Sequence, residues 1–116
     1  MINGAHVILY SHDADADRAF LRDVLGQPHV DAGGGWLIVK LPPAEVAVHP
    51  TDAEQAHELY FLCDDVAATV RELTGRGVEF TAPVTDAGWG LLTRLRLPGG
   101  GEVGLYEARH QRATDL

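Results

Sequence analysis

The sequence contains one pattern twice, and this internal repeat constrains the fold more than any other feature. In the first copy an apolar run, VILY at residues 7–10, is followed by an aspartate; in the second, LYFL at residues 59–62 is followed by another. Further along, Trp36 corresponds to Trp89, and the spacing between corresponding residues grows slowly, as loops of unequal length would produce. Two units this short cannot each bury a core alone, so we expect them to pack together around a shared cavity.

A helix is predicted after the first apolar run of each copy. Ala16, Phe20 and Val24 recur at the spacing of one helix face, and Asp13 precedes them as a candidate N-cap. Asp65 holds the same position before the second helix. Apolar runs bounded by turn residues predict the strands. The expected strands are residues 5–10, 28–33, 36–41 and 45–49 in the first half, and 58–63, 78–81, 89–97 and 102–107 in the second.

Each half therefore has the order βαβββ, which predicts an α+β fold. We expect one domain over residues 1–116, with modules at about 5–50 and 57–108 joined by a polar connector. With both helices on the outer side, the sheets would curl into a half-open β-barrel cup. The cavity between the modules is where we expect a ligand.

Composition narrows the classes of partner. The formal net charge is −8, and the nine basic residues are scattered, which argues against nucleic acid. No apolar run approaches the roughly 20 residues of a membrane span, and residues 1–4 do not resemble a signal peptide. The single cysteine, Cys63, lies inside an apolar strand and is expected to be a buried thiol. These features predict a cytoplasmic protein, and together with the expected cavity they favour a small organic molecule as its partner.

Alternation along the strands predicts which side chains line the cavity. If His6 and Glu58 face inward, all three tyrosines lie on inward faces as well. The two tryptophans begin equivalent strands, and aromatic walls with a few polar groups are typical of a site for a flat ligand. Packing in the core is the alternative for each ring. The aromatic residues expected at the cavity are Tyr10, Trp36, Tyr60, Trp89 and Tyr106.

Two groups of polar residues are expected outside the cavity. Arg94 and Arg96 alternate with leucines, so we expect both arginines to face solvent or a dimer partner. His110 belongs to a polar C-terminal tail that we expect to be frayed.

The order of motifs resembles the vicinal oxygen chelate superfamily, which includes glyoxalase I, extradiol dioxygenases, fosfomycin-modifying enzymes and bleomycin-resistance proteins. The resemblance covers about residues 5–110 and implies the same two-module fold. Its motifs are the strand from His6 to Asp13, RDVLG at 22–26, FLCDDV at 61–66, LPGG at 97–100 and LYE at 105–107.

The resemblance also implies a position for a metal. Metal-dependent members use one ligand from each of four strands, and these positions correspond to His6, Ala47, Glu58 and Gly104. Ala47 and Gly104 cannot bind a metal through a side chain, but His49 shares the face of Ala47. A displaced site of His6, Glu58 and His49 would suit Zn, Fe, Mn or Ni.

Two functions follow from this resemblance. The first is a metal-free protein that sequesters a flat aromatic or apolar compound, as bleomycin-resistance proteins do, with His49 as a further ligand-binding residue. The second is a divalent-metal-dependent lyase, isomerase or extradiol-type dioxygenase that uses His6, Glu58 and His49, with Glu58 as metal ligand or catalytic base. The resemblance implies a homodimer in both cases, with the cavity either inside one chain or completed by the partner.

Overall fold

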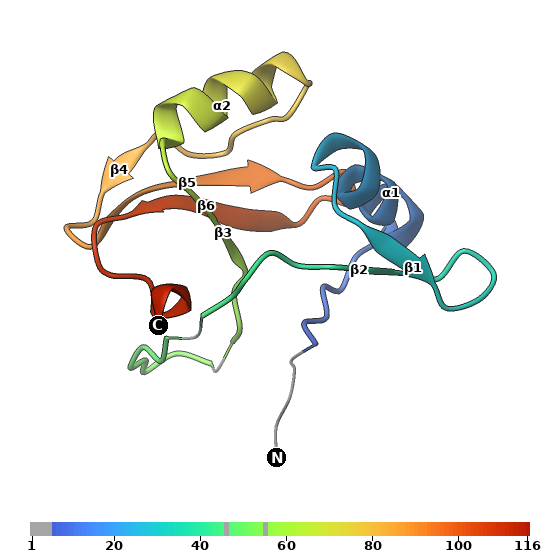
Figure 1. Ribbon diagram of the computed structural model, residues 1–116, viewed down its shortest axis with the longest axis horizontal. Helices are drawn as coiled ribbons and strands as arrows, with labels where there is room; N and C mark the ends of the chain where they lie inside the picture. Colours follow the sequence, from blue (N-terminus) through green and yellow to red (C-terminus); the bar gives the residue numbers. More distant parts are fainter. Residues whose placement is uncertain (1–5, 46, 55) are drawn as a thin grey trace.

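The computed structural model describes residues 6–45, 47–54 and 56–116, and Figure 1 shows the arrangement of their elements. The fold is α+β, as predicted, with two sheets and few helices among the described residues. In chain order the elements are α1 (Ala14–Ala19), the π-helix η1 (Phe20–Val24), β1 (His29–Asp31), β2 (Leu37–Val39), β3 (Tyr60–Cys63), α2 (Val66–Gly75), β4 (Thr85–Asp86), β5 (Gly90–Arg96), β6 (Glu102–Ala108) and the 3₁₀-helix η2 (Ala113–Asp115).

The main sheet has the strand order β3-β6-β5-β4. Strands β5 and β6 form an antiparallel hairpin, while β3 pairs with β6 in parallel. A tight turn closes the hairpin: the Leu97 N–H donates to the Gly101 carbonyl at 2.8 Å, and the Gly100 N–H donates to the Leu97 carbonyl at 2.9 Å. Gly100 has φ = 95°, a conformation that favours glycine. The turn sets the register of the hairpin, which places Arg94 opposite Gly104.

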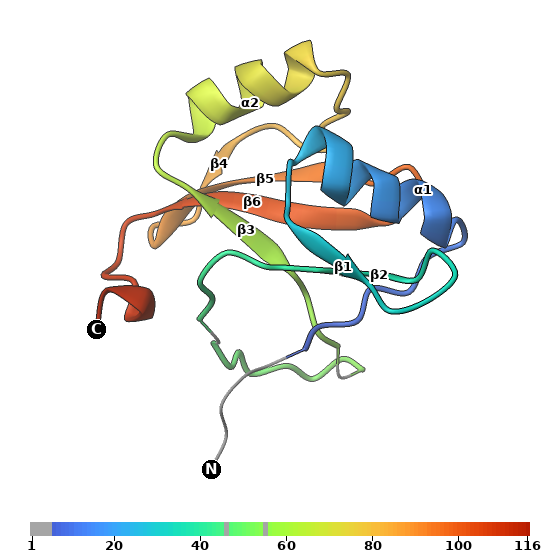
Figure 2. The same cartoon turned by 45° about the vertical axis from the view of Figure 1, so that its right-hand side comes forward.

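The core lies between this sheet and the helices. Figures 1 and 2 show α1 and α2 on the same side of the main sheet. Leu95 of β5 and Val103 of β6 are each only 1% exposed, and they belong to one apolar cluster with Phe20 of η1 and Leu73 of α2. Alternation along β5 and β6 therefore turns every second side chain away from the helices. That other face is free to carry function.

The predicted caps begin both helices. The Asp13 carboxylate accepts from the Ala16 N–H at 3.1 Å, and Asp65 accepts from the Ala68 N–H at 3.0 Å. The first helix continues beyond α1 as a π-helix, which the spacing of its apolar residues did not predict. No helix in the described ranges is both long and apolar enough to cross a membrane.

A buried carboxylate attaches the first helix to the main sheet. Asp17 of α1 is 7% exposed, and its Oδ1 accepts a hydrogen bond from the backbone N–H of Gly99 at 2.7 Å. A Cβ atom at Gly99 would overlap with this carboxylate and with the Ser11 hydroxyl. Glycine at this turn therefore allows the hairpin to come close to α1.

The first half differs from its prediction. Strands were expected at residues 5–10 and 45–49, but described residues 6–10, 45 and 47–49 form none, and Ala5 and Val46 lie outside the described residues. Tyr10 and Val48 are each 93% exposed. The β1–β2 hairpin pairs only with itself among the described residues. An apolar run becomes a strand only when a neighbouring strand satisfies its backbone, and no strand in the described part of the chain pairs with the described residues of these runs.

The second half is closer to its prediction, with differences in detail. Residues 78–81 contribute a single bridge, Phe80 with Leu95, in place of a strand, and β4 was not predicted. No closed barrel forms among the described residues, and the arrangement of two βαβββ modules is not confirmed.

The contact between Asp17 and Gly99 gives the first testable prediction. Replacing Asp17 with alanine should lower the free energy of unfolding by about 2 kcal/mol, because it removes a charged acceptor from a partly buried N–H. Urea denaturation measures this loss. Asp15→Ala is the matched control: Asp15 lies in the same helical turn, its side chain is 93% exposed and it forms a surface ion pair with Arg18, so about 0.5 kcal/mol or less is expected. Equal losses in the two variants would contradict this role of Asp17.

Candidate functional site

The candidate site is the face of the main sheet that the helices leave uncovered. Residues paired across neighbouring strands share a face, and Tyr60, Gly104 and Arg94 are partners in this way. Leu62, Tyr106 and Leu92 are partners in the next row. We call this surface the tyrosine face; it consists of Tyr60, Leu62, Leu92, Arg94, Gly104 and Tyr106.

Four rings gather on and beside the tyrosine face. Tyr106, 9% exposed, is at the centre: its ring centroid lies 5.7 Å from that of Tyr60 and 5.2 Å from that of Trp89. The His49 ring lies 6.4 Å from Trp89. Neighbouring planes meet at 79–80°, the edge-to-face arrangement that aromatic quadrupoles favour. The structure therefore brings together four of the predicted ligand-binding residues, which we call the ring cluster: His49, Tyr60, Trp89 and Tyr106.

Two glycines make room for these rings. A Cβ atom at Gly104 would overlap with the ring of Tyr60, which lies over it from the adjacent strand. A Cβ atom at Gly90 would come within 3.1 Å of the Tyr106 ring. Glycine at both positions lets the tyrosines lie close to the backbone of the sheet.

The remaining predicted aromatic residues lie elsewhere. Tyr10 is almost fully exposed in an irregular segment, and Trp36 is exposed with the Arg18 guanidinium 4.5 Å above its ring. Among the described residues, neither has an aromatic contact with the ring cluster.

Arg94 provides a cation that we did not expect on this face. Its Nη1 donates to the Tyr60 hydroxyl at 3.3 Å, and its Nε donates to Glu102 Oε2 at 3.1 Å. The guanidinium carbon lies 5.7 Å from the centroid of the Tyr60 ring. Alternation with the leucines was correct, but Arg94 shares the face of Tyr106. The LPGG turn at residues 97–100 is the sequence signal that could have shown this position of Arg94, because it fixes the register of the two strands that it joins.

Burial and the charges around Arg94 shift the pKa values of both Arg94 and its neighbour Tyr60. Burial raises the pKa of the Tyr60 phenol, and the negative charge of Glu58 raises it further, so the hydroxyl keeps its proton at neutral pH. Burial alone would lower the pKa of the Arg94 guanidinium. The hydrogen bond to Glu102 and the negative charges of Glu58 and Glu102 act against burial, and the pKa of Arg94 is raised.

A second polar group, formed by Glu45 and the C-terminal segment, lies at the hydroxyl of Tyr106. The Tyr106 hydroxyl donates to Glu45 Oε1 at 3.1 Å, and Glu45 Oε2 accepts from the Ala113 N–H at 2.7 Å. These bonds, led by the one from Ala113, hold the pKa of Glu45 below its usual value. The His110 Nε2 lies 3.5 Å from the Tyr106 oxygen. The C-terminal segment that we expected to fray therefore packs against the ring cluster, a contact that no local sequence signal indicated.

The described residues do not fit a metal in this arrangement. No group of three or more His, Cys, Asp or Glu side chains in the described ranges is placed to hold one. The ring of Tyr60 covers the predicted ligand position at Gly104, and the cation beside Glu58 is the Arg94 guanidinium. His49 contacts the Trp89 ring. The assignment of His6, Glu58 and His49 as metal ligands, with Glu58 as catalytic base, stays a prediction.

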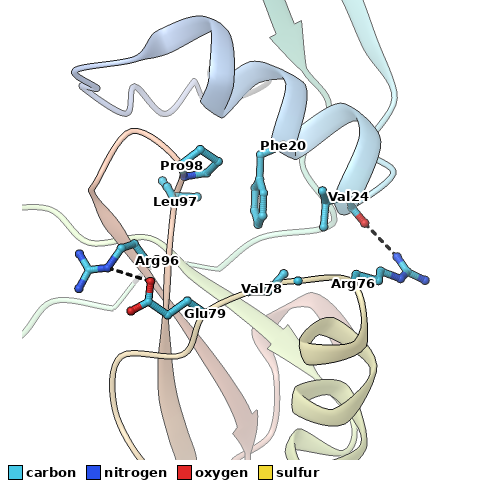
Figure 3. A pocket seen from close by; sticks show the side chains of 9 residues that line it. Phe20, Val24, Arg76, Val78, Glu79, Arg96, Leu97 and Pro98 are labelled. Carbon is cyan, nitrogen blue, oxygen red and sulfur yellow. Dashed lines mark hydrogen bonds and ion pairs between the residues drawn. The ribbon is translucent and has the colours of Figure 1, made fainter.

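The hollow shown in Figure 3 lies on the other side of the sheet. It has a volume of about 320 Å³ and is lined by apolar residues of η1 and of the end of β5, including Phe20 and Leu97. Arg76 and Arg96 are at its rim, and both guanidinium groups point away from it in Figure 3. Arg76 donates to the Val24 carbonyl at 2.9 Å. This hollow is therefore separate from the tyrosine face, which is an open surface.

Comparisons with known proteins agree with this fold. The model of the "Glyoxalase/Bleomycin resistance protein/Dioxygenase superfamily" matches residues 4–103. A lactoylglutathione lyase from Agrobacterium tumefaciens is 19% identical, with a TM-score of 0.64 over 90% of this chain and 92% of that chain. A superfamily member from Sphaerobacter thermophilus is 22% identical, with a TM-score of 0.59 over 90% and 97%.

An antibiotic binding protein, TnmS3 from Streptomyces sp. CB03234, is 25% identical, with a TM-score of 0.62 over 93% of this chain and 99% of that chain. A comparison with curated proteins gives no significant match. The family match covers most of the chain, and the resemblance expected from the sequence is confirmed. The chain belongs to the glyoxalase/bleomycin resistance protein/dioxygenase superfamily.

Proposed function

We propose that the protein binds and sequesters a small, flat aromatic or apolar compound on its tyrosine face. The ring cluster is the observation that carries this proposal. Its central tyrosine is buried by its neighbours, whereas Trp89 remains 40% exposed and can contribute a ring surface to a ligand. Exposed apolar rings with a few polar groups nearby are typical of sites for such ligands. The similarity to an antibiotic binding protein supports the same function.

The polar groups beside the rings fit binding better than metal chemistry. Arg94 and Glu45 occupy their positions through hydrogen bonds to the hydroxyls of Tyr60 and Tyr106. These contacts fix the two tyrosine rings and leave polar atoms at the border of an apolar surface. A ligand can be held there by contact with the rings and by hydrogen bonds, without a metal.

The active form in this proposal is a homodimer in which a second copy covers the unpaired parts of the first half. Strand β3 has β6 as its only strand neighbour among the described residues, so its outer edge is open. Residues 7–10 are apolar and exposed, with Ile8 at 62%. An open strand edge and an exposed apolar run are surfaces that a folded protein tends to cover. A partner chain would also enclose the tyrosine face and complete the two-module arrangement.

The ring cluster predicts which tryptophan matters for binding. Trp89→Ala should weaken the binding of two-ring and three-ring aromatic compounds by about tenfold, the effect of losing one aromatic contact. Isothermal titration calorimetry with a panel of such compounds measures this change. Trp36→Ala is the matched control and should leave affinity within about twofold, because Trp36 contacts Arg18 instead of the cluster. A larger effect at Trp36, or no binding by any compound in the panel, would contradict the proposal.

Removing metals tests the alternative of a metal-dependent enzyme. Dialysis against a chelator should leave aromatic affinity within about twofold, since in this proposal the compound is held by contacts with the rings. Metal analysis of purified protein is the accompanying measurement. Stoichiometric Zn, Fe, Mn or Ni that is lost in His6→Ala, together with a turnover that Glu58→Gln abolishes, would favour the enzyme instead.

The dimer is tested at residue 8. Ile8→Asp should raise the dimer dissociation constant by about tenfold or more, because a charge replaces an apolar side chain that the partner would bury. Sedimentation equilibrium gives this constant. Val84→Asp serves as control at an exposed valine elsewhere on the chain, 44% exposed, and should leave the constant unchanged. A parent protein that sediments only as a monomer would exclude the dimer.

A further inference from the structure

We infer that Arg94 determines the ligand class of the tyrosine face by donating hydrogen bonds to an uncharged oxygen acceptor, such as a ketone or quinone carbonyl, on a flat aromatic ligand. This inference rests on the proposed function and extends it by naming the chemistry of the ligand. Four observations support it: the position of the guanidinium, its remaining donors, the charges beside it and the geometry of the neighbouring ring.

The position of Arg94 follows from strand pairing. Gly104 is the cross-strand partner of Arg94 on one side and of Tyr60 on the other, so all three lie in one row of the sheet. Because Gly104 has no side chain, the Tyr60 ring lies over it and comes within 5.7 Å of the Arg94 guanidinium. Tyr60 in turn contacts Tyr106 at the centre of the ring cluster. A flat molecule on the cluster would therefore have its edge close to Arg94.

Arg94 has N–H groups that are available to a ligand. A guanidinium carries five N–H groups in a rigid plane. One from Nε goes to Glu102 and one from Nη1 goes to the Tyr60 hydroxyl, and no further acceptor for Arg94 is found in the described part of the chain. The side chain is 31% exposed, so a ligand can reach the remaining N–H groups. Two adjacent N–H groups of this kind can hold a carbonyl oxygen in a fixed direction.

The neighbouring charges select an uncharged acceptor. Glu102 lies 3.1 Å from Arg94 and balances its charge, and Glu58 is close enough to raise the pKa of the guanidinium. Arg96 shares Glu102 at 3.7 Å, but it also lies 3.5 Å from Glu79. An anionic ligand would thus meet carboxylates that already neutralise the arginines. A carbonyl oxygen accepts the same hydrogen bonds without this repulsion.

The neighbouring phenol keeps the guanidinium in place. The Tyr60 hydroxyl accepts from Nη1, and its raised pKa keeps it neutral, so it orients Arg94 without adding a negative charge at neutral pH. Arg94 is held from two sides, by Glu102 and by Tyr60. Holding a donor in position before the ligand arrives reduces the entropy lost on binding.

The test compares two naphthalenes of similar shape, 2-acetonaphthone with a carbonyl and 2-ethylnaphthalene without one. In the parent protein both should bind. Arg94→Met should weaken the binding of 2-acetonaphthone by about tenfold, because the ketone loses hydrogen bonds from a charged donor. The affinity for 2-ethylnaphthalene, which has no acceptor to lose, should stay within about twofold. Arg94→Lys should recover part of the ketone affinity, since an ammonium still donates. Arg71→Met removes an exposed guanidinium from α2, on the other side of the sheet, and should change neither affinity. Quenching of tryptophan fluorescence measures all of these constants.

The outcomes separate this inference from the proposed function. Equal losses of affinity for both compounds in Arg94→Met would mean that Arg94 only shapes the ring cluster. That result would overturn the inference and leave the proposed function intact. A third probe, 2-naphthoate, tests the charge: it should bind no more tightly than 2-acetonaphthone, and tenfold tighter binding would overturn the choice of an uncharged acceptor. If no probe binds the parent protein, the proposed function fails and the inference fails with it.

Discussion

The register of the β5–β6 hairpin determines both the core and the candidate site. The two strands are joined by the turn at residues 97–101, where Gly100 has the positive φ that the turn needs. With this register Leu95 and Val103 face the helices and are almost fully buried, while Arg94 and Tyr106 face the other way. A slip by one residue would exchange the two faces of the slipped strand, placing charged side chains in the core and apolar ones outside. The apolar core and the polar contacts of the tyrosine face therefore stabilise the same pairing.

Local signals in the sequence were enough to predict most of the second half. Asp65 as N-cap, the apolar run before it and the glycine-rich turn each specify structure within a few residues. Helix α2 begins directly after its predicted cap, and β5 and β6 lie close to their expected bounds. The first half shows the limit of such signals. Residues 6–10 have the composition of a strand, but a strand also needs a partner, and the choice of partner is not encoded in the run itself. Asp13 was correctly predicted as a cap because capping is a local interaction.

The same distinction applies to the candidate site. Tyr60 and Tyr106 were predicted at the site from alternation along single strands, and Trp89 from its place at the start of a repeated strand. The structure brings their rings together. Arg94 was predicted to face solvent or a dimer partner and was not connected with the tyrosines, because the hairpin register was not used, although the turn specifies it. The contact of His110 with Tyr106 depends on how the chain folds back after β6, and no periodicity within the sequence indicates it. Contacts between distant segments are thus the part of the site that the sequence alone could not supply.

The overlap of Tyr60 with Gly104 has a consequence for how this surface can change during evolution. A histidine or glutamate at position 104 would need the space that the Tyr60 ring fills. A single substitution there displaces the ring, and the described residues hold no group of three or more His, Cys, Asp or Glu side chains that it could complete, so the aromatic surface is lost before metal binding is gained. The replacements at 60 and 104 are advantageous only together. Binding through rings and catalysis through a metal are therefore two separate optima for this sheet, and the path between them passes through a sequence that does neither well.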